Sequence, residues 1–333
     1  MLKKKVLLKG PILTQSGYGH HTRTVLRALR TREDLFDIYI HALTWGATGW
    51  LWEDTEERKW IDQTVQKTLE YARYGGAFDV SLQVTIPNEW DQIAPINIGI
   101  TAGIETNKVS PHWLDKSRIV DKIITISEHS KQVYEDTTYN LQHPETGQEV
   151  RIGCEAPIDY VSYPVRTFEP CDLDLNLTTD FNYLSVVQIS PRNNLPQMLK
   201  AFVEVHKDNE DVGLILKVNT AKNSIIDRLN TMGNLKEIVN QYNDRKCKIY
   251  LLHGYLSDEE MSALYNHPKV KAFVSTTHGE GFGLPMFEAA SYGLPVIAPD
   301  WSGHVDFLYM PTDSGKGKKQ KKKNKAMFSR ISY

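Results

Sequence analysis

"HGEGFGLPMFEAASYGLPVIAPDWSG", residues 278–303, is the stretch from which the fold of this chain can be worked out. The apolar run just before it, residues 271–277, is typical of a buried strand, so residues 278–284 form the loop at the strand's carboxyl end. Pro285 suits the first residue of the following helix, where a missing backbone NH has no cost. The stretch therefore predicts a strand, a tight loop and a helix, with a further strand at residues 294–299.

This loop is suited to binding a phosphate group. Backbone NH groups and the positive end of the helix dipole converge there, and Gly281 and Gly283 carry no β carbon to keep a ligand away. Glu288 falls about one turn into the helix, where a carboxylate could accept two hydrogen bonds from the hydroxyls of a ribose. Glu280 lies nearer to whatever is attached beyond the phosphates. The pattern predicts a site for a nucleoside diphosphate that carries a third group; the plainer alternative is a tight turn with two solvated carboxylates.

Short apolar strands alternate with amphipathic helices in both halves of the chain. This rhythm is the signature of parallel sheets covered on both faces, so we expect two Rossmann-like doubly wound α/β domains that face each other across a cleft. A stretch with two prolines and no sustained period separates the halves. The expected organisation is a first Rossmann-like domain at 1–165, a linker at 166–180, a second Rossmann-like domain at 181–315 and a lysine-rich, solvated and mobile tail at 316–333.

The composition excludes several classes of partner and compartment. The chain has 39 basic and 41 acidic residues, a net charge of −2, so it has no overall signature for binding nucleic acid. Its three cysteines, Cys154, Cys171 and Cys247, lack the spacing of a disulfide framework or a zinc site. The first apolar run is broken by Lys9 and Pro11, and no stretch approaches the length of a membrane span. We expect a cytoplasmic protein whose lysine-rich tail is solvated; a weak contact of this tail with an anionic membrane surface is the alternative.

Residues 251–303 closely resemble retaining glycosyltransferases of the family 4 type, and Glu280 and Glu288 resemble their EX7E motif. The resemblance is specific from Tyr183 to Phe307 and looser before residue 165. It implies the GT-B fold, with residues 1–165 as the acceptor-side domain and residues 181–315 as the nucleotide-sugar-binding domain. The position of Glu288 would hold the donor ribose, and that of Glu280 would lie beside the donor sugar. The loop NH groups between them would meet the sugar and diphosphate. The donor-binding residues implied there are Gly281, Phe282, Gly283, Leu284 and Glu288.

The amino-terminal motif SGYGHHTR resembles the first glycine loop of the same family. The resemblance implies that Gly17 and Gly19 face the diphosphate and the acceptor; a plain strand-to-helix turn is the alternative. Glu105 directly follows an expected strand and could orient an acceptor hydroxyl or the sugar, or simply cap a turn.

The chain departs from the family in two places. The family has an arginine and a lysine after the first strand of its second domain, and here Gln188 and Asn193 stand at those positions. Arg192 is the cation nearby, and we expect its guanidinium to contact the phosphate instead. The family's second domain also continues beyond the position of residue 308 through more strands and a closing helix, so we expect this one to be truncated at its C-terminal end.

Several other residues have competing interpretations. Ser127 stands where a helix N-cap belongs. The adjacent His20 and His21 would point in different directions, which argues against a shared metal, and the Asp-x-Asp pattern beginning at Asp172 lies in the linker. Some tryptophans could stack on sugars or belong to the core, and the sequence does not choose between the two. They are Trp45, Trp50, Trp52 and Trp90.

The function expected from these observations is that of a hexosyltransferase. It would move a sugar from a nucleotide diphosphate sugar to the hydroxyl of a glycan, lipid or protein acceptor, with retention of configuration and with no metal or other cofactor. The alternatives are a GT-B nucleotide-sugar epimerase or phosphorylase, and a non-catalytic or degenerate nucleotide-sugar-binding protein. A nicotinamide-dependent enzyme is disfavoured because GYGHHT lacks the third glycine of G-x-G-x-x-G.

Overall fold

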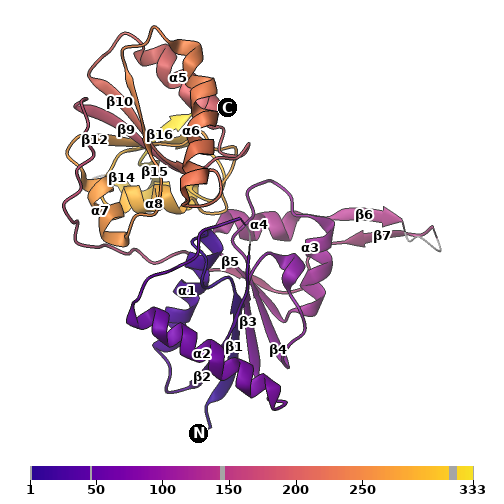
Figure 1. The fold of residues 1–333 in the computed structure, drawn as a ribbon. Helices are drawn as coiled ribbons and strands as arrows, with labels where there is room; N and C mark the ends of the chain where they lie inside the picture. The colour runs from indigo at the N-terminus through magenta and orange to yellow at the C-terminus, as the bar shows by residue number, and fades with distance from the viewer. Residues whose placement is uncertain (1, 46, 143–146, 315–320, 333) are drawn as a thin grey trace. The chain divides into compact units, whose positions relative to one another are not determined.

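The computed structural model describes residues 2–45, 47–142, 147–314 and 321–332 (Figure 1). The chain divides into two compact units, Met1–Tyr163 and Pro164–Tyr333. Each unit is built on a parallel six-stranded sheet with helices packed on it. The prediction of an α/β protein with two Rossmann-like domains is therefore confirmed. No helix in the described part of the chain combines the length and the apolar character needed to cross a membrane.

The first unit has the strand order β2-β1-β3-β4-β5-β8, with every neighbouring pair parallel. Its buried core includes Leu8 and Ile40 from the sheet and Leu26 and Ile61 from the helices. The strands are β1 (Lys4–Gly10), β2 (Phe36–Ala42), β3 (Val80–Val84), β4 (Ile96–Ile100), β5 (Lys122–Thr125) and β8 (Ile158–Tyr160), with a hairpin of β6 (Tyr139–Gln142) and β7 (Glu149–Ile152). The helices are α1 (Gly17–Arg30), α2 (Glu56–Arg73), α3 (Pro111–Lys116) and α4 (Glu128–Asp136).

Serine caps fix where two of these helices begin. The Ser127 hydroxyl accepts the backbone NH of Ser130 at 3.0 Å, so the predicted N-cap of α4 is confirmed. Ser16 does the same for α1, accepting the NH of Gly19 at 3.0 Å. Helix α1 therefore begins at Gly17, and the glycine motif forms its first turn.

The second unit has the strand order β11-β10-β9-β12-β13-β16, again parallel throughout. The strands are β9 (Phe181–Gln188), β10 (Val212–Asn219), β11 (Lys248–Leu252), β12 (Val270–Val274), β13 (Val296–Pro299) and β16 (Ser329–Ile331). The chain builds outward from β9 through β10 to β11 and then crosses to β12 on the other side. The carboxyl ends of β9 and β12 therefore flank a topological switch point, the place where such sheets bind ligands.

Helices cover the second sheet on both faces (Figure 1). Leu199 and Phe202 of α5 and Leu235 of α6 pack with Leu214 and Leu216 of β10 on one face. The other face carries a second cluster formed with α7 and α8, which contains Leu184, Ile215, Leu264, Met286 and Ala289. The helices are α5 (Leu195–His206), α6 (Ile225–Val239), α7 (Asp258–Asn266), α8 (Leu284–Ser291) and the short α9 (Val305–Leu308).

The stretch expected to be a linker, residues 166–180, contains no helix or strand but packs onto the second unit. Leu173, Leu175 and Leu177 lie against the α7–α8 cluster, and the Phe168 NH donates to the Tyr292 hydroxyl at 2.9 Å. The segment is therefore part of the second unit's surface.

Residues 321–331, which we expected to belong to a tail, contain two strands. Strand β15 (Lys321–Ala326) pairs antiparallel with β14 (Tyr309–Ser314), and β16 then pairs parallel with β13. The reason is apolar anchoring just after the lysine run, because Phe328 packs against the α7–α8 cluster and on Tyr309, with ring centroids 5.7 Å apart. The second unit thus extends beyond the boundary expected at residue 315. Three of the seven lysines of the run, Lys316, Lys318 and Lys319, lie outside the described residues.

Candidate functional site

The loop after β12 has the strand–loop–helix form that the sequence predicts. Helix α8 begins at Leu284, with Gly283 at its N-cap in the left-handed conformation (φ 85°), and Pro285 follows in the first turn. A side chain at Gly283 would be strained by this φ angle. No side chain caps the helix. The first intrahelical bond runs from Phe287 NH to Gly283 C=O, so the NH groups of Leu284 and Met286 precede the intrahelical ladder.

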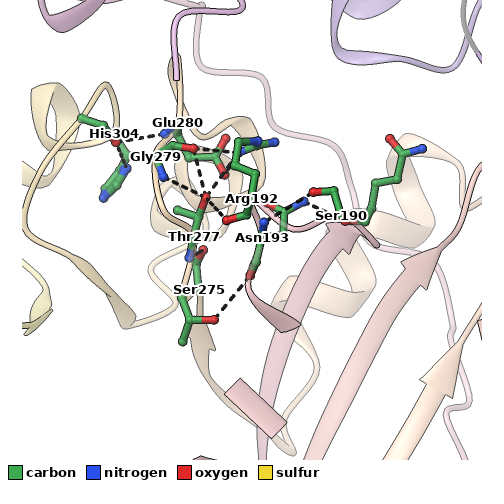
Figure 2. Close-up of polar contacts among 11 residues, drawn as sticks. Ser190, Arg192, Asn193, Ser275, Thr277, Gly279, Glu280 and His304 are labelled. Carbon is green, nitrogen blue, oxygen red and sulfur yellow. Dashed lines mark hydrogen bonds and ion pairs between the residues drawn. The ribbon is translucent and has the colours of Figure 1, made fainter. Parts of the chain in front are cut away.

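Glu280 is ion-paired to Arg192. The Arg192 Nη1 atom lies 2.6 Å from Glu280 Oε1 and donates to the Gly279 carbonyl at 2.8 Å (Figure 2). The arginine segment is tied to the same loop through its backbone, because the His278 NH donates to the Arg192 carbonyl at 2.8 Å. The side chains of Arg192 and Glu280 are 32% and 17% exposed, so a ligand can still reach the pair. The structure therefore brings together two residues that the sequence placed 88 positions apart.

The segment after β13 holds the backbone of Glu280 in place. The Glu280 NH donates to the Ser302 hydroxyl at 3.0 Å, and the Gly303 NH donates to the Glu280 carbonyl at 2.8 Å. Ser302 is buried and its backbone has φ 78°, a conformation that residues other than glycine rarely adopt. His304 is buried behind it, with Nε2 2.7 Å from the Pro299 carbonyl, and burial lowers its pKa. Sequence reasoning missed Ser302 and His304; no periodicity marks them.

Replacing Gly303 by alanine tests this support. A Cβ atom there would lie 2.0 Å from the Gly281 carbonyl oxygen, so the glutamate loop has to shift. We expect Gly303→Ala to destabilise the protein by roughly 1–3 kcal/mol, the usual cost of overpacking, measured by thermal unfolding. Gly233→Ala in α6 is the matched control, because its Cβ meets nothing within 4 Å and should be neutral or stabilising. Equal Tm values for the two variants would contradict this account of the loop.

Glu288 lies in a largely desolvated position on α8. It accepts a hydrogen bond from the Tyr265 hydroxyl at 2.9 Å, and Tyr265 stacks on Tyr292. Burial raises the pKa of Glu288 to about 7, although the Tyr265 bond favours the ionised form. Asp258 raises this pKa further and Arg166 lowers it, and those two groups form an ion pair with each other at 2.8 Å. Glu288 is therefore not the solvated surface carboxylate of the plainer alternative.

The side chain of Phe282 in the loop packs in the interior of the second unit. Phe282 is 3% exposed and its ring packs with Phe287 and Phe307, at centroid separations of 5.1 and 5.0 Å. Its side chain therefore belongs to the core, and an interaction of Phe282 with a ligand would be through its NH or carbonyl group.

The two neutral residues at the family's cation positions are engaged elsewhere. The Gln188 amide donates to the Thr220 carbonyl at 2.9 Å, and the Asn193 amide donates to the Gln188 carbonyl at 2.7 Å. Both bonds shape the turn between β9 and α5. These side chains build the loop that carries Arg192.

In the first unit, the structure brings the glycine motif close to the loop that carries Glu105. The link is Tyr18, whose buried hydroxyl lies 2.8 Å from the Thr101 hydroxyl and accepts the Ala102 NH at 3.1 Å. Gly19 is needed for close packing, because a Cβ there would lie 2.1 Å from the Thr14 carbonyl. Gly17 has open space around it. Sequence reasoning missed Tyr18, although it stands between the two glycines.

The histidines and tryptophans of the first unit separate into core and surface groups. The ring of His21 is buried, with Nδ1 2.9 Å from the Tyr163 hydroxyl, and burial lowers its pKa to about 4. Trp90 is fully buried, whereas Trp50 and Trp52 are 49% and 73% exposed. Within the described residues, no group of three or more His, Cys, Asp or Glu side chains is placed to hold a metal ion.

Most of the second unit is similar to a known family. Residues 174–310 match the family described as Glycosyl transferases group 1. The matched residues include Arg192, Glu280 and Glu288. The match ends before β15 and β16, the strands that the sequence analysis did not anticipate.

One curated relative and two solved structures are similar to this chain. The serotype-specific mannosyltransferase WbdA of Escherichia coli is 30% identical over 119 residues, which are 36% of this chain and 13% of that protein. Sucrose-phosphate synthase from Thermosynechococcus elongatus has a TM-score of 0.59 at 15% identity, over 94% of this chain and 85% of that one. The catalytic domain of starch synthase IV from Arabidopsis thaliana, bound to ADP and acarbose, has a TM-score of 0.55 at 11% identity, over 100% and 88%. The last two comparisons show the shared fold alone.

Proposed function

We propose that this protein is a retaining glycosyltransferase of the family 4 type, which moves a hexose from a nucleotide diphosphate sugar to an acceptor hydroxyl. The observation that carries the proposal is the desolvated Glu288 on α8, at one end of a glycine loop whose other end holds Glu280. The group 1 glycosyltransferase match of residues 174–310 supports the same reading.

The donor-binding roles follow from this arrangement. Ionised Glu288 would accept two hydrogen bonds from the ribose hydroxyls, and these hydrogen bonds would offset the cost of its burial. The diphosphate would lie at the start of α8, where the NH groups of Gly281 to Leu284 and the helix dipole favour negative charge. Arg192 has five N–H donors, so its guanidinium can keep Glu280 and still offer NH groups to a phosphate oxygen.

The chemical step requires stabilisation of a leaving diphosphate and an oxocarbenium-like centre. We propose that the acceptor hydroxyl attacks from the face that the diphosphate leaves, and that a diphosphate oxygen takes the acceptor proton. The carboxylate of Glu280, fixed by Arg192, Ser302 and Gly303, would stabilise the positive charge that develops on the sugar. In this account no side chain forms a covalent bond to the sugar.

The acceptor-side roles belong to the first unit. We propose that Gly17, Gly19 and Glu105 act there, because Tyr18 brings the turn between the two glycines against the loop that carries Glu105. The acceptor would be a glycan, or a lipid or protein that presents a hydroxyl. Free thiols at Cys154, Cys171 and Cys247 suit the reducing compartment in which we place the protein, the cytoplasm or its membrane surface.

The experiment that tests the function is ligand-observed NMR with UDP, GDP, ADP and NADH, followed by turnover assays with sugar conjugates of whichever nucleotide binds. We expect one nucleoside diphosphate to bind and its sugar conjugate to be consumed only when an acceptor is supplied. Consumption without an acceptor would favour the epimerase alternative. Nucleotide binding without turnover on any donor would favour the non-catalytic protein, and binding of NADH alone would overturn the proposal.

Chelation provides a separate test of the metal-free mechanism. We expect an excess of EDTA, about 5 mM, to change the transfer rate by less than about twofold relative to the untreated protein. In this account helix dipoles and basic side chains stabilise the leaving diphosphate. Re-addition of Mg²⁺ or Mn²⁺ should then have no effect on the rate. A rate that falls with EDTA and returns with either metal would show that the mechanism needs a cation.

A further inference from the structure

A lysine that the sequence analysis did not single out lies near the carboxyl edge of the second sheet. Lys217 is on β10, in register with Val186 of β9 and Leu252 of β11. Ile215, two residues earlier, belongs to the cluster on the α7–α8 face, and so do Val186 and Leu252. Because side chains alternate along a strand, Lys217 projects on that same face. It therefore shares a face of the sheet with α8.

The charge of Lys217 is not neutralised within the described part of the chain. Its Nζ atom donates to the Gly254 carbonyl at 2.5 Å. No carboxylate of the described residues forms an ion pair with it, and a lysine ammonium has three donors, of which this bond uses one. Burial lowers the pKa of Lys217 to about 8, and no neighbouring charge offsets that effect. The ammonium of Lys217 is therefore partly withdrawn from water without a neighbouring carboxylate.

Other cations of the same unit show what a compensated charge looks like. Lys269 also donates to a carbonyl, that of Leu177 at 3.0 Å, but it has Asp180 at 3.1 Å as well. Arg192 has Glu280, and Arg166 has Asp258. Lysine is seldom buried without a partner, since desolvating an ammonium is costly. Lys217 is half-buried and has no carboxylate partner among the described residues, so its ammonium can still bind an anion.

The position of Lys217 indicates which anion this is. Parallel strands end at one edge of their sheet, so the end of β10 lies along the same edge as the loop that starts α8. The ligand proposed for that edge carries two phosphate groups. We propose that Lys217 binds the diphosphate of the nucleotide, as a point charge supplied by the second strand of the domain. This inference rests on the proposed function and adds a residue to its donor site.

A purely structural role for Lys217 leads to a different expectation. If it only fixed the turn at Gly254, which has φ 115°, its loss would disturb everything bound nearby to the same extent. An ammonium that contacts phosphate affects only ligands that carry phosphate. The comparison between a nucleoside and its diphosphate therefore separates the two roles.

The test is calorimetric titration of the full chain with UDP, GDP and ADP and with uridine, guanosine and adenosine. We expect Lys217→Met to weaken the diphosphate that the wild type binds by about 10- to 100-fold, as for loss of one charge-assisted contact. The affinity of Lys217→Met for the corresponding nucleoside should stay within about twofold of the wild-type value. Lys217→Gln, which keeps a donor for Gly254, should behave the same way and covers the case in which the methionine variant fails to fold. Lys269→Met is the matched control and should leave both ligands unaffected.

Each outcome decides between the proposals. Equal losses for nucleoside and diphosphate, or no loss for either, would overturn the role of Lys217 while leaving the nucleotide site intact. A wild-type protein that binds none of the three diphosphates would overturn the proposed function itself, and the role of Lys217 with it.

Discussion

Replacing Glu288 by glutamine is expected to abolish most of the affinity for ribonucleotides. The ionised carboxylate would accept two charge-assisted hydrogen bonds from the ribose, each worth roughly 1.5–3 kcal/mol. Glutamine has one acceptor oxygen and cannot replace both. We expect the Kd of the bound nucleoside diphosphate to rise by about 100-fold or more, measured by calorimetry, while a 2',3'-dideoxy analogue binds the variant and the wild type equally.

The pH dependence of nucleoside binding, compared between the wild type and Glu288→Gln, gives an independent check. Burial raises the pKa of Glu288 from 4.5 to about 7, so the protonated form prevails at pH 6 and the ionised form at pH 8. Nucleoside binding to the wild type should therefore tighten by up to about tenfold between pH 6 and pH 8. The nucleoside carries no phosphate that titrates in this range. The Glu288→Gln variant should show no such change.

The linked effect on stability has the opposite sign. A carboxyl group whose pKa is raised in the folded state stabilises the fold at pH values below its unfolded pKa, and this contribution is lost as the pH rises through about 7. Glu288→Gln should therefore gain stability relative to the wild type between pH 5 and pH 8, by up to about 3 kcal/mol.

An exposed carboxylate provides the control for both effects. Glu204 lies on the surface of α5, 3.9 Å from Lys200. The Glu204→Gln variant should therefore bind the nucleotide as the wild type does, with the same pH dependence. A Glu288→Gln protein that binds nucleotide as the wild type does would remove the ribose contact from the proposed mechanism.

The parts of the structure that could be predicted from sequence are those governed by local rules. Pro285 and the glycines before it specify a loop that opens a helix. Ser127 caps a helix because its hydroxyl satisfies a nearby NH group. In each case the decisive interaction lies within a few residues of the chain.

The parts that could not be predicted depend on contacts between distant segments. The pairing of Arg192 with Glu280 requires the carboxyl ends of β9 and β12 to be neighbours, which the strand order provides and no local pattern reveals. Ser302 supports Glu280 only because the ends of β12 and β13 meet. Strand β16 was not predicted because it is short and follows a run of lysines. Its place in the sheet depends on contacts with distant residues: Phe328 packs against the α7–α8 cluster, and Ile331 pairs with Pro299 of β13.

A double-mutant cycle on Glu280 and Arg192 is expected to show the second large effect. Glu280→Gln keeps the shape of the side chain but removes the charge proposed to stabilise the transition state, so kcat should fall by about 10²- to 10³-fold. Nucleotide affinity should change by less than about threefold, because the carboxylate acts on the sugar. Arg118→Met, which breaks an exposed guanidinium–carboxylate pair with Glu155 at 2.8 Å in the first unit, is the control and should change neither.

Arg192 has two proposed tasks, and the cycle separates them. If the guanidinium orients Glu280, Arg192→Met should lower kcat in the wild type but add little in the Glu280→Gln background, where there is no charge left to orient. If it also contacts phosphate, its loss should raise the Kd of the nucleoside diphosphate by a similar factor, about tenfold, in both backgrounds. A loss of affinity confined to the protein that retains Glu280 would mean instead that Arg192 merely neutralises that carboxylate. The phosphate would then depend on the start of α8 and on Lys217 for its positive charge.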